Sequence, residues 1–185
     1  HVAEFAAAGA PPTSIQVQYS LLDRRPAGAF TATASASNTG LICYGALAGG
    51  FLSARWLGAQ DPAETLTNRS LIKYRLIIDE CGGWDAFQAL LAVLDRIAQA
   101  HAVPLSAVAA RWVLDQPGVA AVIIGARHAG HLADTLAIAH LRLSAADHAA
   151  IAAVLPVGPQ GDVYALERDR DGRHGRIMKY NLNKT

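Results

Sequence analysis

Three short apolar segments, separated by stretches with helical spacing, restrict the fold of this chain more than any other feature. Residues 15–21 alternate apolar and polar side chains, residues 41–43 are all apolar, and residues 118–127 form a continuous apolar run that reaches a glycine. Strands that alternate with helices are typical of α/β proteins, in which neighbouring strands pair in parallel. We therefore expect a parallel sheet, with the third strand buried on both of its faces.

The expected helices differ in how clearly the sequence encodes them. Residues 84–103 form a strongly amphipathic pattern, whose apolar face carries Phe87, Leu90, Leu91, Leu94, Ile97 and Ala98. Ser144 and Asp147 have the spacing of a capping box, which predicts a helix start. Residues 53–83 contain scattered glycine and proline, so we expect a long irregular connection there, of the kind that is usually functional or mobile.

Composition excludes several classes of protein. The 185 residues suffice for one domain with a sizeable core, and 52% of them are apolar, so the chain is globular. A net charge of +1 gives no reason to expect nucleic acid or a membrane surface as a partner. No apolar run approaches the ~18 residues of a transmembrane helix. The two cysteines, Cys43 and Cys81, lack the spacing of a metal site and are interpreted as reduced thiols of a cytoplasmic protein.

The first residue is His1, and the only methionine is Met178. We therefore expect the chain to be a fragment, a processed form or a trimmed part of a longer protein.

Candidate ligand-binding residues follow each of the three strands, where α/β proteins bind their ligands. The first strand carries Gln16, Gln18 and Tyr19, and the second ends at Tyr44 before glycines 45, 49 and 50. The third leads into Gly125, Ala126 and Arg127, just before a predicted helix. Backbone N–H groups at a helix start favour an anion, and a neighbouring arginine adds to that effect. An aromatic face beside an anion cradle suits a nucleotide cofactor.

The same segments resemble a known family. The stretches IQVQYSLLDRRP, CYGALAGGFLS, VAARWVLDQPGVAAVIIGARHAGHLADT and LRLS are similar to the carboxyl-terminal half of an aldo-keto reductase, over about residues 1–156. That family folds as a (β/α)₈ TIM barrel and moves hydride between NADPH, sometimes NADH, and a carbonyl. The resemblance implies an α/β partial barrel with only the last three strands and their helices. It divides the chain into a barrel half, residues 1–157, and a charged carboxyl-terminal tail, residues 158–185.

The resemblance also implies a role for each site residue. Gln16 matches the glutamine that binds the nicotinamide carboxamide, and Tyr44 matches the tyrosine that stacks on the nicotinamide ring. The segment expected along the pyrophosphate contains Gly45, Ala46, Leu47, Gly49 and Phe51, and the loop expected near the adenosine phosphate contains Gly125, Ala126 and Arg127. His131 stands where many members have Arg or Gln, and Thr135 where most have Asn. The cofactor is therefore left as NADP(H) or NAD(H).

The catalytic Asp, Tyr, Lys and His of the family come from the amino-terminal half, whose motifs are absent from these 185 residues. The chain alone is therefore expected to contain no catalytic residue and no metal site, and to be inactive by itself. Its expected partners are a small aldehyde, ketone or alcohol, together with the missing amino-terminal half or a second copy. The alternative is a non-catalytic nucleotide-binding or interaction protein derived from a truncated barrel.

Overall fold

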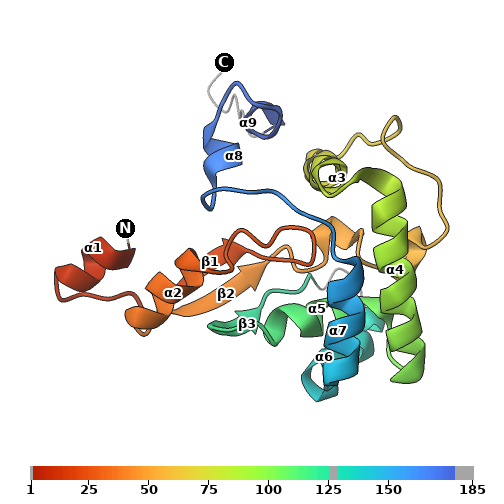
Figure 1. Cartoon of the computed structure of the whole chain (residues 1–185), viewed down its shortest axis with the longest axis horizontal. Helices are drawn as coiled ribbons and strands as arrows, with labels where there is room; N and C mark the ends of the chain where they lie inside the picture. The colour runs from red at the N-terminus through yellow and green to blue at the C-terminus, as the bar shows by residue number, and fades with distance from the viewer. Residues whose placement is uncertain (1, 126–128, 178–185) are drawn as a thin grey trace.

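The computed structural model describes residues 2–125 and 129–177 and confirms the alternation of strands and helices (Figure 1). Its helices and strands are α1 (Val2–Ala7), β1 (Ser14–Gln18), α2 (Ala29–Ala36), β2 (Gly40–Tyr44), α3 (Arg69–Glu80), α4 (Gly83–Ala100), α5 (Leu105–Leu114), β3 (Val119–Val122), α6 (Leu132–His140), α7 (Ala145–Val154), α8 (Ala165–Arg168) and α9 (Arg173–Ile177). Short 3₁₀ turns η1 (Ala48–Gly50), η2 (Ala54–Trp56) and η3 (Ala129–His131) join them.

The three strands form one sheet in the order β1-β2-β3, and both pairs are parallel, as expected. The two faces of this sheet differ. Val17, Leu41 and Cys43 are fully buried in the core. On the opposite face, Gln16 and Tyr44 keep part of their surface exposed. The second face corresponds to the barrel interior in the predicted fold.

The expectation that the third strand is buried on both faces is wrong. β3 spans only four residues, and Ala120 within it is exposed. The reason is its position at the edge of the sheet, where it pairs with β2 on one side only in the described part of the chain. Its apolar residues are those of a strand that requires further neighbours to become fully buried.

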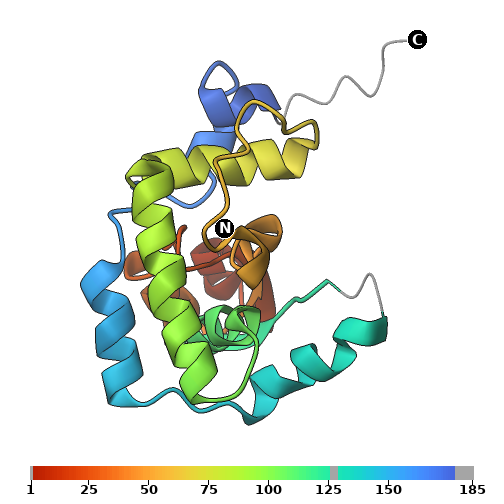
Figure 2. The ribbon, with the colours of Figure 1, turned by 90° about the vertical axis from the view of Figure 1, so that its right-hand side faces the viewer.

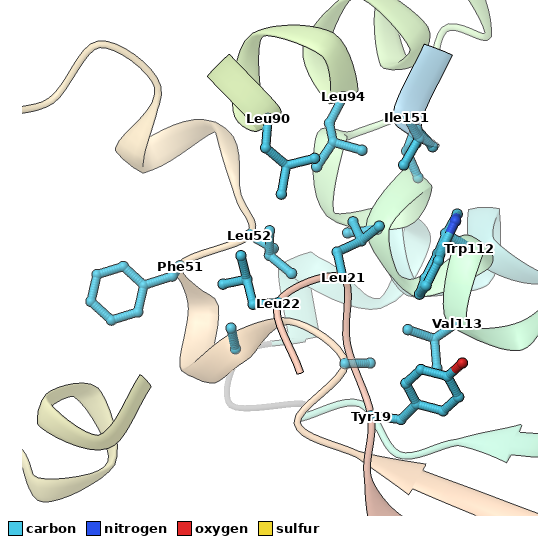
Figure 3. Close-up of a cluster of buried hydrophobic side chains, with 14 of the residues drawn as sticks. Tyr19, Leu21, Leu22, Phe51, Leu52, Leu90, Leu94, Trp112, Val113 and Ile151 are labelled. Atoms are coloured by element: carbon cyan, nitrogen blue, oxygen red, sulfur yellow. The ribbon is translucent and has the colours of Figure 1, made fainter. Parts of the chain in front are cut away.

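The hydrophobic core lies between the sheet and helices α4, α5 and α7 (Figure 3). Leu90 and Leu94 of α4 and Ile151 of α7 point toward Leu21 and Leu22, which follow β1. All six residues predicted for the apolar face of α4 are buried, which confirms the amphipathic pattern. Burial of each large side chain stabilises the fold by about 1.5–3 kcal/mol.

The capping box at the start of α7 is also confirmed. The Ser144 hydroxyl accepts the Asp147 N–H at 3.1 Å, and the Asp147 carboxylate accepts the Ser144 N–H at 2.8 Å. The same carboxylate contacts Nε2 of His101 at 2.9 Å, which ties the start of α7 to the end of α4.

The interpretation of residues 53–83 as an irregular connection is wrong for its second half. Asn68 caps a twelve-residue helix, α3, by accepting the N–H groups of Ser70 and Leu71 at 2.9 and 3.3 Å. An asparagine at this position satisfies N–H groups that otherwise lack partners at a helix start. The buried face of α3 includes Tyr74, Ile77 and Ile78, so tertiary packing supports the helix as well.

After α7 the chain returns over the carboxyl ends of the strands, and α8 and α9 lie beside α3 (Figure 2). Gly158 makes this return possible, because a Cβ there would collide with the backbone carbonyl of Leu22. Val163 then joins the main core. The described part of the tail, residues 158–177, therefore packs onto the rest of the chain; a domain boundary at residue 157 stays a prediction.

Candidate functional site

The turn after β2 brings a glycine-rich backbone against α3. Gly45 and Gly49 have positive φ angles of 70° and 67°. A Cβ on Gly45 would lie 2.5 Å from the Tyr74 hydroxyl, and one on Gly49 would lie 2.6 Å from Cδ2 of the same ring. Both glycines are therefore required by backbone conformation and by close contact with Tyr74.

A cavity of about 600 Å³ opens between this turn and the end of β3. Its lining consists of Gly45, Ala46, Leu47, Gly49, Gly50, Ser70, Tyr74, Ile123, Ile124, Gly125 and His131. A second cavity of about 300 Å³ adjoins it, and adds Ser53, Ser106, Asp134, Thr135 and Ile138 to a shared part of that lining. We call the two together the glycine cavity. It brings together seven of the predicted residues, namely Gly45, Ala46, Leu47, Gly49, Gly125, His131 and Thr135.

The remaining predicted residues lie elsewhere. The Phe51 side chain is fully buried, with its ring centroid 4.9 Å from that of Trp56, and it lines neither part of the glycine cavity. Gln16 and Tyr44 lie at the neighbouring β1–β2 corner. Ala126 and Arg127 lie outside the described residues.

The β1–β2 corner holds the two residues matched to the nicotinamide. The register pairs Gln16 with Ile42 and Gln18 with Tyr44, so these side chains share one face of the sheet. Tyr44 is half-buried; burial raises its pKa, and the neighbouring Tyr164 side chain raises it further. The Tyr164 hydroxyl donates to the backbone carbonyl of Gln16 at 2.8 Å.

A network of buried polar side chains lies beside this corner. Gln18 is buried, and its amide donates to Asp23 Oδ2 at 2.7 Å. The Gln18 carbonyl oxygen accepts from Lys73 Nζ at 2.6 Å, which connects β1 to α3. The whole amide of Gln18 is therefore engaged within the protein and is unavailable to a ligand.

Arg25 connects the same corner to the tail. Its guanidinium donates to both carboxylate oxygens of Asp23, at 2.9 and 2.7 Å, and to both of Glu167, each at 3.1 Å. Glu167 also lies 3.6 Å from Lys73. Burial alone would raise the pKa of Glu167, but the hydrogen bonds and charge of Arg25 outweigh it and hold the pKa below its ordinary value. We call Asp23, Arg25, Lys73 and Glu167 the charge cluster.

The sequence indicated residues 53–83 and the tail as segments that could shape a pocket, but it did not indicate which of their residues contribute. Ser70 and Tyr74 line the glycine cavity, and Tyr164 and Glu167 reach the β1–β2 corner. The signal for α3 was present in its Asn68 cap and its helical apolar spacing. The tail contacts leave no comparable local signal, because their partners are more than 140 residues away in the chain.

Comparison with known proteins identifies the family. The model of the Aldo/keto reductase family matches residues 1–156. The chain belongs to the aldo/keto reductase family. It is 33% identical to an aldo-keto reductase of Babesia bovis over 121 residues, which cover 63% of this chain and 41% of that protein. It is 35% identical to the flagellar radial spoke protein 5 of Chlamydomonas reinhardtii over 111 residues, which cover 58% of this chain and 21% of that protein.

A solved structure confirms the fold of this aldo/keto reductase family member. The glycerol dehydrogenase AKR11B4 from Gluconobacter oxydans superimposes with a TM-score of 0.62 at 23% identity, over 80% of this chain and 45% of that chain. The three parallel strands and their helices thus form part of the TIM-barrel fold, as predicted. The chain spans less than half the length of each of these relatives.

Two further observations concern the described residues only. No helix among them has both the length and the apolar character needed to cross a membrane. Within residues 2–125 and 129–177, no group of three or more His, Cys, Asp or Glu side chains is placed to hold a metal ion.

Proposed function

We propose that the whole protein is an NAD(P)(H)-dependent aldo-keto reductase, which reduces a small aldehyde or ketone or oxidises an alcohol, and that this chain holds the cofactor. The observation that carries the proposal is that two complementary sites lie side by side at the carboxyl ends of the strands. A polar corner with a free amide and an aromatic ring lies beside a glycine-lined cavity. The polar corner suits the nicotinamide ring and its carboxamide, and the glycine-lined cavity suits the pyrophosphate.

At the β1–β2 corner, the residues fit a nicotinamide. The Gln16 side chain is exposed, and among the described residues its amide has no hydrogen-bond partner. An amide offers one acceptor and two donors, which match the acceptor and donors of a carboxamide. The ring of Tyr44 supplies an aromatic surface for stacking.

At the β2–β3 corner, the residues fit phosphate groups. Glycines 45 and 49 leave the backbone of the turn accessible from the glycine cavity, and His131 and Thr135 extend its lining toward α6. We propose that Arg127, which follows Gly125 in the sequence, meets a 2′-phosphate if the cofactor is NADPH.

The cofactor, when bound, supplies or accepts the hydride. The proton must come from the family's catalytic tyrosine, which the resemblance assigns to the amino-terminal half. We therefore propose that this chain alone binds cofactor but catalyses no reduction.

Titration of the whole protein with NADPH and with NADH, followed by tryptophan fluorescence, tests the proposal. Tyr44→Ala should weaken binding of the preferred cofactor by roughly 1–3 kcal/mol, the worth of one aromatic stack on a base. Arg168→Ala is the matched control, because Arg168 is exposed and its ion pair with Asp162 is exposed as well. Absence of binding by the unaltered protein would refute the cofactor assignment.

A second candidate is a protein that binds a nucleotide without catalysis. The similarity to a Chlamydomonas protein named as part of a flagellar radial spoke favours it, since the name describes an assembly rather than a reaction. Cofactor binding without turnover across aldehydes, ketones and alcohols would select this candidate over the first.

We further propose that the exposed apolar side chains of Ile123, Leu132 and Leu136, which are 43%, 58% and 55% exposed, are covered by the amino-terminal half of the barrel or by a second copy. Residues 1–185 alone should then be oligomeric or aggregation-prone in sedimentation experiments. A monodisperse monomer with a sharp thermal transition would contradict this. A cytoplasmic location remains a proposal, supported by two buried, unpaired cysteines, Cys43 and Cys81.

A further inference from the structure

The tail places one tyrosine hydroxyl between the two residues of the β1–β2 corner. Tyr164 donates to the Gln16 carbonyl at 2.8 Å, and its side chain lies near enough to that of Tyr44 to raise the pKa of the Tyr44 hydroxyl. Since Tyr44 and Gln16 belong to neighbouring strands, this single tail residue is bonded to the backbone of one strand and lies beside the aromatic side chain of the other. The family match ends at residue 156, so Tyr164 lies beyond the segment that the match describes.

Tyr164 is held at this position at a cost. Its φ angle is 66°, in the left-handed region that bulky side chains rarely adopt. Such a conformation is strained and persists only where surrounding contacts hold it.

The contacts that hold it lie one helical turn later, at Glu167. Both oxygens of this carboxylate accept from Arg25, whose side chain is only 3% exposed, and one lies near Lys73. Further along, His174 Nε2 contacts Glu80 at 2.8 Å and Arg173 pairs with Asp79 at 3.2 Å, so the tail is attached to α3 as well.

We propose that Tyr164 is a positioning residue: the tail, fixed by Glu167, uses the Tyr164 hydroxyl to set the Tyr44 ring and the Gln16 backbone in place for a nicotinamide ring. The inference rests on the proposed function, because it takes the β1–β2 corner as the nicotinamide site. Its physical basis is preorganisation: a ring and an amide already held in their binding positions lose less freedom when the ligand arrives. The glycine cavity, at the other corner, makes no contact with Tyr164.

The experiment compares two ligands on the whole protein. NAD(P)H has both a nicotinamide and phosphates, whereas ADP-ribose, or its 2′-phosphate derivative if NADPH is preferred, has the phosphates without the nicotinamide. Tyr164→Phe should weaken binding of the dinucleotide about three- to tenfold, the usual worth of a lost hydrogen bond, and should leave ADP-ribose binding unchanged. Arg168→Ala, which removes an exposed ion pair with Asp162 from the same segment of the tail, should change neither.

The reciprocal variant keeps the test valid if Tyr164→Phe lowers stability. Tyr44→Phe retains the ring and removes the other hydroxyl, and it should also weaken only the dinucleotide. Because the two hydroxyls are proposed to act together at one place, the double variant should bind no more weakly than Tyr164→Phe alone.

Three results would overturn the inference: unchanged dinucleotide binding by Tyr164→Phe, an equal loss of both ligands, or additive losses in the double variant. Failure of the unaltered protein to bind either ligand would instead refute the proposed function on which the inference rests.

Discussion

The two corners of the sheet edge are built in opposite ways. At the β1–β2 corner, buried polar side chains satisfy one another through the charge cluster and Gln18. At the β2–β3 corner, glycines and short side chains leave a cavity of about 600 Å³. Both corners lie at the carboxyl ends of adjacent strands of one sheet.

The difference shows how one edge can recognise a ligand with two unlike halves. A flat ring is held best by groups that are fixed in advance, and buried ion pairs with full hydrogen bonding fix their surroundings. A pair of phosphates is held best where backbone N–H groups remain accessible, and glycine allows that approach. The four predictions below test this contrast, from the largest expected effect to the smallest.

Removal of Arg25 should have the largest effect, and it should act on the β1–β2 corner. Arg25→Ala leaves the buried carboxylate of Asp23, which is 1% exposed, without its cation. Loss of one partner of such a pair typically costs about 3–5 kcal/mol of unfolding free energy, which urea denaturation of the whole protein measures. Arg168→Ala, at an exposed pair on the same tail, should change stability by no more than about 0.5 kcal/mol. Similar losses for the two variants would mean that the charge cluster contributes nothing special.

The β2–β3 corner should instead be sensitive to added atoms. Gly49→Ala places a methyl group against the Tyr74 ring at a positive φ, and should cost roughly 1–3 kcal/mol of stability. Gly50→Ala is the control, since it shares a positive φ but meets no atom within 4 Å. The excess of the first loss over the second measures the contact with Tyr74, and no excess would show that the ring moves freely.

The preference between NADPH and NADH should depend on Arg127 and not on the β1–β2 corner. Arg127→Ala should lower NADPH affinity roughly tenfold and leave NADH affinity nearly unchanged, if charge-assisted bonds to a 2′-phosphate are lost. Paired titrations of both cofactors measure this. Equal losses would place Arg127 at the pyrophosphate or in the fold, and no loss would remove it from the site.

The contribution of the β1–β2 corner to stability should also depend modestly on pH. The pKa of Glu167 is lowered in the folded protein, so its contribution to stability is complete above the unfolded pKa of ~4.3. That contribution is lost as the pH falls through the lower folded pKa. Glu167→Gln should therefore flatten the stability profile in the acid range; a profile identical to that of the unaltered protein would contradict the assignment.

Local patterns were sufficient to predict much of this molecule. The apolar face of α4 and the capping box at Ser144 and Asp147 depend on neighbours within one or two helical turns, and both are confirmed. The parallel order of the strands follows from the helices between them. Seven of the residues that the family resemblance indicated do line the glycine cavity.

The remaining features depend on partners that are distant in the chain. Tyr74 faces the glycines only because α3 folds back over the turn, and the glycines alone suggested a ligand in the place where its ring packs. Tyr164, which lies near Tyr44, was not indicated either, since it follows Tyr44 by 120 residues. Arg25 and Glu167 were not indicated, because no local pattern distinguishes a buried ion pair from a solvated one.

Neighbouring residues of α3 face the two corners. Lys73 contacts Gln18 and Glu167, while Tyr74 contacts the glycine turn. Any displacement of this helix therefore moves a wall of the glycine cavity and a support of the tail together. By thermodynamic linkage, a ligand that stabilises one position of α3 changes the free energy of tail docking, and a docked tail changes that ligand's affinity by the same amount.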